Sequence, residues 1–242
     1  MQLNAWMGRL TRQLLPVIER EQPDILTMQE VFSSAHPTPL PDNMFDLYER
    51  VQAIGYAHSF FSPICSFQAG SQTVQFGNAL FSKYPILSQE TFFTSGSFQP
   101  DCSTPDFQIN ARNAQIVKLS TGEKTLHVIN HHGYWESDPS GSDATVLAMR
   151  TLTDHARKLT TPLIFAGDLN VNPNTPAMGL FDGWLEDLTK TYDITDTLSP
   201  LGKVRDVACD HILTSTDVHV RSLRTLDEIV SDHKALLLEF EF

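Results

Sequence analysis

Short apolar runs that are typical of β-strands recur along this chain of 242 residues, and several of them lead into acidic residues. Residues 25–29 lead into Glu30, residues 163–166 lead into Asp168, and residues 208–213 contain Asp210. These strands alternate first with helical patterns and later with other strands. This order favours an α/β (α+β) fold in which mixed sheets pack as a sandwich, rather than a doubly wound parallel sheet.

The spacing of apolar residues predicts the individual elements. We expect helices over residues 8–21, 45–54 and 143–159, the first containing Pro16 and the last capped by Asp143. We expect strands over residues 1–6, 25–29, 76–82, 111–119, 126–130, 163–166, 208–213 and 234–242. The segments 33–42, 91–108 and 135–142 are expected to be loops. The length fits a single domain over residues 1–242.

Charge and composition exclude several classes of protein. The chain carries 17 Lys and Arg against 29 Asp and Glu, a net charge of −12. Long duplex DNA is therefore not expected as a partner, because each phosphate contact needs a cationic group. No apolar run approaches the ~18 residues of a transmembrane helix, and no secretory signal is visible. The three cysteines are too widely spaced for a zinc knuckle or a disulfide framework. We expect a cytoplasmic monomer.

The polar residues at the strand ends suit one chemistry. Carboxylate and amide oxygens are the ligands that Mg²⁺ prefers, so Glu30 and the segment Asp168-Leu169-Asn170 fit a site that holds a hard cation and hydrolyses a phosphoester. In extended backbone Asp168 and Asn170 would face the same cleft, while Leu169 packs inward. Each motif taken alone also fits an ordinary strand end or a polar turn.

Histidines add a second set of candidates. His233 follows Asp232 directly, and Asp210 is a candidate to fix its tautomer and favour its charged form. One histidine of the pair at 131–132 could contact a phosphate. The chain contains no Gly-x-Ser-x-Gly segment, no glycine-rich phosphate loop and no dinucleotide fingerprint. These absences disfavour serine hydrolases, P-loop enzymes and dinucleotide-dependent enzymes.

The order of these segments resembles that of the endonuclease/exonuclease/phosphatase superfamily, whose fold is like that of deoxyribonuclease I. The resemblance covers essentially the whole chain and rests on Asn4, Gln29-Glu30, residues 77–82, Asn130-His131-His132, residues 167–170, Asp210-His211-Ile212 and Ser231-Asp232-His233. Three positions depart from the pattern. Trp6 replaces an acidic residue of many nucleases, His132 replaces a Tyr of the abasic-site repair enzymes, and Gly133 replaces a common Leu. These departures argue against abasic-site endonuclease activity.

The resemblance implies a four-layer sandwich, with two mixed β-sheets face to face and helices outside, and a bound Mg²⁺ or Mn²⁺. It implies that Glu30 holds the metal together with Asn4, and that Asp232 either binds the metal or supports its ligands. Asp168 would orient or deprotonate the attacking water. Asn170 and His132 would contact phosphate oxygens. His233, held by Asp210, would stabilise the charge of the transition state. Asn78 would support the ligands from behind.

The expected function is therefore a divalent-metal-dependent phosphoesterase that hydrolyses a phosphodiester or phosphomonoester by in-line attack of an activated water. The expected substrate is a small or single phosphoester, because the chain is acidic. One alternative is a nuclease on single-stranded or short nucleic acid. The other is a non-catalytic binding protein on the same fold.

Overall fold

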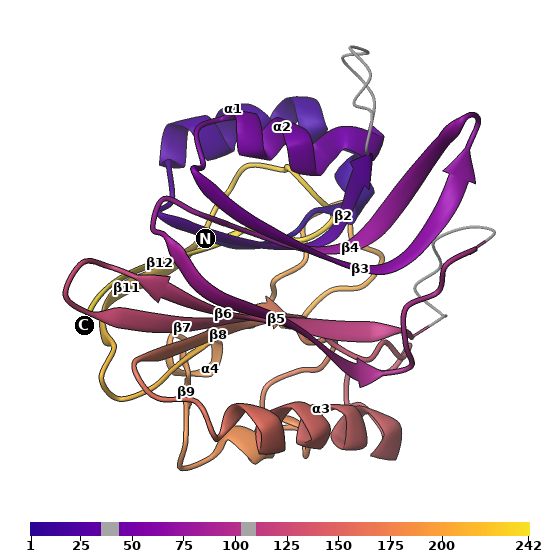
Figure 1. The fold of residues 1–242 in the computed structure, drawn as a ribbon. Coiled ribbons are helices and arrows are strands. Elements are labelled where there is room, and N and C mark those ends of the chain that lie inside the picture. Colours follow the sequence, from indigo (N-terminus) through magenta and orange to yellow (C-terminus); the bar gives the residue numbers. More distant parts are fainter. Residues whose placement is uncertain (35–43, 103–109) are drawn as a thin grey trace.

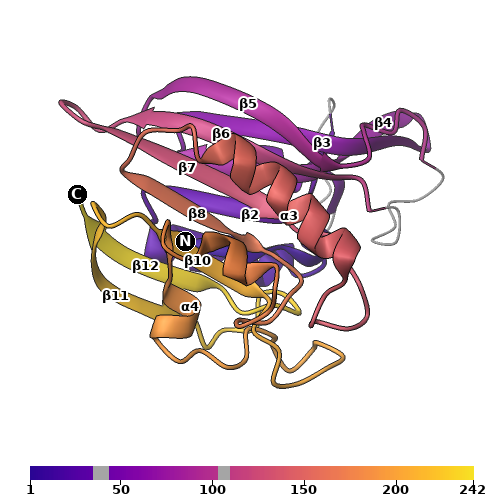
Figure 2. The same ribbon diagram turned by 90° about the horizontal axis from the view of Figure 1, so that it is seen from below.

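The computed structural model describes residues 1–34, 44–102 and 110–242. Among these residues the strands form two six-stranded sheets that lie face to face. Helices α1 (Thr11–Glu21) and α2 (Leu47–Ala53) cover the outer face of the first sheet, whereas α3 (Asp143–Ala156) covers the outer face of the second (Figures 1 and 2). The short α4 (Leu188–Thr191) lies near the edge of the second sheet, and its Leu188 packs between the sheets. The four-layer α/β sandwich expected from the sequence is thus confirmed.

The first sheet is mixed, because β1 pairs in parallel with β2 and antiparallel with β12. Its strand order is β11 (His219–Thr225), β12 (Leu236–Glu241), β1 (Gln2–Asn4), β2 (Ile25–Ser34), β4 (Gln72–Ser82) and β3 (His58–Ala69). The first and last strands of the chain therefore meet in the middle of one sheet. This pairing brings the end of β1 next to the segment that precedes β12.

The second sheet is also mixed, with β7 and β8 parallel and its other pairs antiparallel. Its order is β5 (Ile86–Ser95), β6 (Arg112–Ser120), β7 (Thr125–His132), β8 (Leu163–Asp168), β10 (Asp210–Thr214) and β9 (Glu186–Asp187). The central strands β7, β8 and β10 carry the predicted site residues of this sheet.

Several expected boundaries were wrong. Residues 91–95 belong to β5, not to a loop, and residues 33 and 34 belong to β2. Strands β3 and β11 were not expected at all. β5 and β11 are edge strands with many exposed polar side chains, so their sequences look like loops. Residues 35–42 and 103–108 of the expected loops lie outside the described residues, whereas 96–102 and 135–142 belong to no named helix or strand.

Two helices differ in detail from the expectation. Helix α1 begins at Thr11 rather than at residue 8, and Pro16 lies inside it. The cap of α3 is Ser142 and not Asp143: the Ser142 hydroxyl accepts a hydrogen bond from the Ala144 N–H at 3.1 Å. The Thr145 side chain accepts one from the Ser142 N–H at 3.2 Å, which completes a capping box. Ser142 takes this role because its backbone is still extended.

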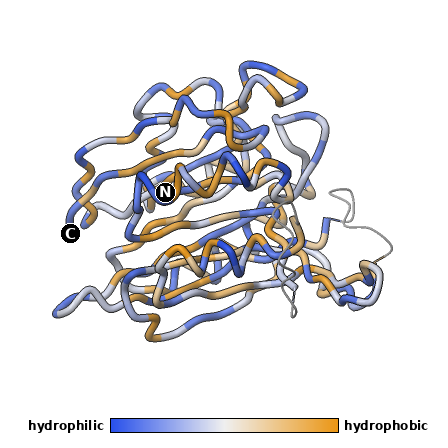
Figure 3. The backbone as a smooth tube through the Cα atoms, turned by 90° about the horizontal axis from the view of Figure 1, so that it is seen from above, coloured by the Kyte–Doolittle hydropathy of each residue, from blue (hydrophilic) through white to orange (hydrophobic). Residues whose placement is uncertain are grey.

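Apolar side chains fill the space on both faces of each sheet. One buried cluster lies between the sheets and includes Leu80, Val117, Ile164 and Leu236. Two others lie beneath α1 and α2 and beneath α3. Figure 3 shows hydrophobic stretches along the strands, alternating with hydrophilic residues toward the loops. Burial of these faces is the main favourable term for the sandwich.

Buried amide side chains interrupt this apolar layer and link the two sheets. The Gln2 side-chain amide donates to Asp210 Oδ1 at 2.9 Å and to Gln29 Oε1 at 3.1 Å. Gln29 donates to Asn130 Oδ1 at 2.6 Å, and Asn130 donates to Gln115 Oε1 at 2.7 Å. Buried polar groups are costly unless they are paired, so these bonds specify how the sheets align.

Candidate active site

Strand register aligns three predicted residues at one end of the second sheet. His132 on β7 lies opposite Asp168 on β8, and Asp210 on β10 lies opposite Asp168 on the other side. The close approach of β7 and β8 needs Gly167, because a Cβ atom there would lie 1.9 Å from the backbone oxygen of His131. Three candidate side chains therefore follow directly from the pairing of β7, β8 and β10.

Glu30 reaches the same place from the first sheet, but not as the last residue of a strand. β2 continues to Ser34, and Glu30 occupies a β-bulge with φ 55°. The bulge breaks the alternation of side chains between Met28 and Val31. Left-handed backbone is rare for residues other than glycine and is commonly found at functional sites. The bulge thus directs Glu30 toward the cleft where strict alternation would not.

Asn4 bridges the two sheets at this cleft. Its side-chain amide donates to Asp168 Oδ2 at 2.9 Å and to Glu30 Oε1 at 3.3 Å. Its Oδ1 atom accepts a hydrogen bond from the Trp6 N–H at 3.0 Å. In this arrangement Asn4 aligns the two carboxylates, and one lone pair of its Oδ1 atom is engaged.

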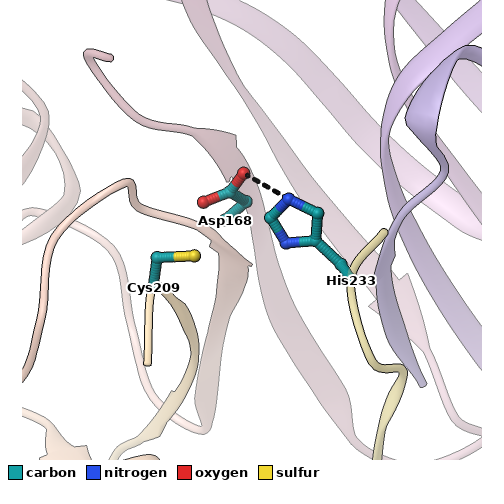
Figure 4. Close-up of side chains that lie close together, drawn as sticks. All are labelled: Asp168, Cys209 and His233. Carbon is teal, nitrogen blue, oxygen red and sulfur yellow. Dashed lines mark ion pairs between the residues drawn. The ribbon is translucent and has the colours of Figure 1, made fainter. Parts of the chain in front are cut away.

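His233 enters from the segment before β12 and forms a charged pair with Asp210. Its Nδ1 atom lies 2.8 Å from Asp210 Oδ2, and its Nε2 atom lies 3.8 Å from Asp168 Oδ2 (Figure 4). The preceding Ser231 anchors this segment, because its hydroxyl donates to the Asn4 backbone oxygen at 2.7 Å. Asp232 is half-buried and close enough to Glu30 for its charge to affect that carboxyl.

Burial and mutual repulsion act on the carboxylates. Burial raises the pKa of Glu30 to about 7, and the negative charges of Asp232 and Asp168 contribute. Burial also raises the pKa of Asp168 and of Asp232. Crowded carboxylates of this kind are stabilised by a bound cation, and their oxygen atoms suit a hard ion. The oxygen atoms of Glu30 and Asp232, with Asp168 nearby, are therefore donors of the type that Mg²⁺ or Mn²⁺ prefers.

The pKa values of the two imidazoles in the cleft, His233 and His132, are shifted in opposite directions. Burial alone would lower the pKa of His233, but the Asp210 and Asp168 carboxylates raise it well above its ordinary value. Burial would raise the pKa of Asp210, yet His233 outweighs burial and lowers it. Burial and the charge of Arg112 instead lower the pKa of His132 well below its ordinary value. His233 is thus a cationic donor, whereas His132 is a neutral ring. The His132 Nε2 atom lies 3.6 Å from Asp168 Oδ2.

Asn170 lies beside Asp168, but not through the extended backbone expected. Its φ is 58°, its N–H donates to Asp168 Oδ1 at 3.0 Å, and its side chain donates to the Gly133 backbone oxygen at 3.1 Å. Leu169 is fully buried, as expected. A Cβ atom at Gly133 would lie 2.3 Å from the Leu169 oxygen, so this turn leaves no room for the Leu common in the superfamily.

Asn78 lies deeper, between the sheets. Its side chain donates to the backbone and side-chain oxygens of Asn113 at 2.9 and 3.0 Å. Asn113 follows Arg112, which was not among the predicted site residues although it is only 1% exposed. Burial lowers the pKa of Arg112, while the negative charges of Glu30 and Asp168 favour its charged form. A charged residue at the start of an apolar strand was the signal for Arg112, just as a charged residue at the end of an apolar run was the signal for Glu30.

Comparison with known families supports the same picture. The model of the Endonuclease/Exonuclease/phosphatase family matches residues 1–233. The chain belongs to this family. Members of the endonuclease/exonuclease/phosphatase family are hydrolases that act on phosphoester bonds, and they generally use a divalent metal. A search of curated proteins gives no match.

Solved structures share the fold at low sequence identity. The mannosyl-6-phosphatase Bt3783 of Bacteroides thetaiotaomicron is 17% identical, with a TM-score of 0.71 over 100% of this chain and 98% of that chain. The human Nocturnin catalytic domain with bound sulfate is 20% identical, with a TM-score of 0.68 over 97% and 87%. TDP2 of D. rerio complexed with single strand DNA product is 16% identical, with a TM-score of 0.70 over 100% and 97%.

One cavity lies away from this site, near both termini. Its volume is about 530 Å³, and it is lined by Met1, Ile164 and Phe240, among others, but by none of the predicted site residues. The chemistry of the side chains, rather than the size of this cavity, therefore locates the candidate site. Within the described residues no helix is long and apolar enough to cross a membrane.

Proposed function

We propose that this member of the family is a divalent-metal-dependent phosphoesterase that hydrolyses its substrate by in-line attack of water. The observation that carries the proposal is the convergence of Glu30, Asp168 and the Asp210–His233 pair in one cleft, through hydrogen bonds that span both sheets. A binding protein has no need for a strained Glu30 or for a charged imidazole beside a carboxylate. The non-catalytic alternative is therefore disfavoured.

Glu30 and Asp232 are the proposed metal ligands. Mg²⁺ or Mn²⁺ held there would polarise a phosphoryl oxygen. Asn4 positions Glu30 through its 3.3 Å hydrogen bond, and the second lone pair of its Oδ1 atom lets it join these two carboxylates as a ligand. Asn78 supports the site through Asn113 and the buried start of β6.

Asp168 is the proposed group that orients the attacking water and accepts its proton. The raised pKa of its carboxyl makes it a stronger base than an exposed Asp. Asn4 and Asn170 each donate a hydrogen bond to Asp168, one to each carboxylate oxygen, and these bonds fix the orientation of the carboxylate. A base with a fixed orientation can accept the proton of the water in a single, well-defined geometry.

Three side chains are proposed to act on the phosphoryl oxygens, and a fourth supports them from behind. His132, whose ring is neutral, and Asn170 hold two of them. The His233 cation, held by Asp210, stabilises the negative charge that grows in the transition state. Arg112 adds positive charge behind Glu30 and Asp168. Preorganised donors of this kind commonly supply the largest part of a rate enhancement.

The proposed substrate is a small or single phosphoester. With a net charge of −12 the chain is poorly suited to the phosphates of long duplex DNA. The fold is shared by a mannosyl-6-phosphatase and by a protein solved with a single-strand DNA product. A nuclease on single-stranded or short nucleic acid is accordingly the second candidate.

The reaction class is tested by hydrolysis of bis-p-nitrophenyl phosphate and p-nitrophenyl phosphate with Mg²⁺, with Mn²⁺ and with excess chelator. We expect activity only with metal, and a fall in kcat of at least ~100-fold in Asp168→Asn and in His233→Ala. His155→Ala is the matched control, because that histidine is paired with Glu90 outside the cleft. Hydrolysis that persists in chelator would contradict the proposal.

The substrate class is tested separately at ~0.15 M salt, where exposed charges are screened beyond ~8 Å. Plasmid nicking and cleavage of a short single-stranded oligonucleotide are compared with hydrolysis of the small diester. We expect the small diester to be the better substrate. Efficient nicking at low plasmid concentration would instead favour the nuclease.

A further inference from the structure

Cys209 is a buried thiol in the candidate active site to which the proposed reaction assigns no role. It directly precedes Asp210 and is only 5% exposed. Its sulfur points toward the His233 ring (Figure 4). It lies 3.7 Å from Asp210 Oδ2 and 3.8 Å from Thr197 Oγ1. A thiol is a soft ligand, which is unexpected among oxygen donors that suit Mg²⁺.

The sulfur belongs to a compact group of three donors. One ligand atom each from Asp168, Cys209 and His233 lies within 4.8 Å of the others. His233 Nε2 and Asp168 Oδ2 are 3.8 Å apart. Bonds of ~2.0–2.3 Å to tetrahedral zinc place neighbouring ligand atoms roughly 3.3–3.8 Å apart. The three donors therefore need only small movements to enclose such an ion.

The orientation of His233 also suits zinc. Asp210 holds the Nδ1 atom at 2.8 Å, which directs Nε2 toward Asp168. A carboxylate behind a ligating imidazole is the usual arrangement in zinc sites, since it fixes the tautomer and the direction of the ring. Three protein donors match the ligand number of catalytic zinc sites, in which the fourth position is left to water or substrate.

We propose that Asp168, Cys209 and His233 form a binding site for Zn²⁺ that inhibits the enzyme. Binding would engage the proposed base and the proposed cationic donor at once, so the inhibitory part rests on the proposed function. Mg²⁺ prefers oxygen ligands and would remain with Glu30 and Asp232. Zinc would therefore inhibit in the presence of excess magnesium.

Zinc binding is measured first, without reference to activity. The purified protein is titrated with Zn²⁺ against a chromophoric chelator in excess Mg²⁺. We expect one equivalent to bind, at least ~10-fold more weakly in Cys209→Ser. Cys102→Ser is the matched control, because that buried thiol packs in the separate cluster with Cys65 and should leave zinc affinity unchanged.

Cobalt is the spectroscopic probe of the same site. Co²⁺ should produce a thiolate-to-metal charge-transfer band in the wild type and in Cys102→Ser, but not in Cys209→Ser. Cys209→Ala, with circular dichroism to check folding, is the second variant if Cys209→Ser misfolds. The proposal is overturned if the wild type shows no such band, or if Cys209 variants that fold bind zinc as tightly as the wild type.

Inhibition is then measured relative to the magnesium-activated rate of each variant. The zinc concentration that halves this rate should rise at least ~10-fold in Cys209→Ser and stay unchanged in Cys102→Ser. Equal sensitivity of all three proteins would overturn the inhibitory role. If the protein hydrolyses no phosphoester, the proposed function fails, and the titration and the cobalt spectrum still decide whether the zinc site exists.

Discussion

Replacing Asp210 by Asn removes one charge from the buried pair with His233 while keeping the shape of the side chain. The wild-type carboxylate lies 2.8 Å from His233 Nδ1 and also accepts a hydrogen bond from Gln2. An Asn oxygen can still accept from Gln2, so the link between the sheets should survive. The main consequence should be loss of the charge that keeps His233 protonated.

The size of the effect follows from the burial of this pair. Removing one partner of a buried ion pair costs about 3–5 kcal/mol. One pKa unit corresponds to about 1.4 kcal/mol, so the pKa of His233 should fall by about 2–4 units. In the wild type that pKa is raised, so the cation persists at neutral pH and is lost only as pH rises through the raised value. In the variant the cation is lost at lower pH, and kcat at neutral pH should fall at least ~100-fold.

The assay is the pH dependence of kcat for bis-p-nitrophenyl phosphate in saturating Mg²⁺. The alkaline decline of kcat should move toward acidic pH in Asp210→Asn. Asp187→Asn is the matched control: Asp187 forms a similar pair with His211, whose ring is buried against Val171 rather than in the cleft. An Asp210→Asn enzyme with wild-type kcat and an unmoved profile would refute the role assigned to the pair.

Three further predictions concern stability and metal. Burial would lower the pKa of His211, but the Asp187 carboxylate outweighs burial and raises it. This pair therefore stabilises the fold fully below pH ~6.5, and the stabilisation is lost as pH rises through the raised pKa of His211. Urea unfolding from acidic to alkaline pH should show a smaller loss of stability in Asp187→Asn than in the wild type, because the raised pKa of His233 contributes equally to both. Glu30→Gln should need at least ~10-fold more Mg²⁺ for half-maximal activity, and an unchanged requirement would exclude Glu30 as a ligand. Gly167→Ala should lower the free energy of unfolding by at least about 2 kcal/mol, because its Cβ would meet backbone of β7, whereas Gly179→Ala, whose Cβ would have space, should not.

Local sequence determined much of the framework. Alternation and periodicity identified the central strands and the helices, because each element must bury one face. Leu169 is buried in the core after β8 and Asp168 faces the cleft, as the pattern indicated. A charged residue at the end of an apolar run pointed to Glu30, because a charge next to buried strand residues is costly unless it has a partner or a function.

Long-range packing decided what local patterns could not. The edge strands β5 and β11 exist because neighbouring strands pair with them, although their exposed faces are polar. The left-handed backbone of Glu30 and of Asn170 is imposed by a bulge and by hydrogen bonds to Asp168 and Gly133.

The site itself was also assembled by packing. Asn4 and Asp168 are 164 residues apart, and Gln2 and Asp210 are 208 apart, yet each pair is joined by a hydrogen bond of 2.9 Å. Sequence alone predicted the residue types that would meet. Their distances, and the pKa shifts that follow from them, depend on how two sheets align, and this alignment is set by contacts between residues far apart in the chain.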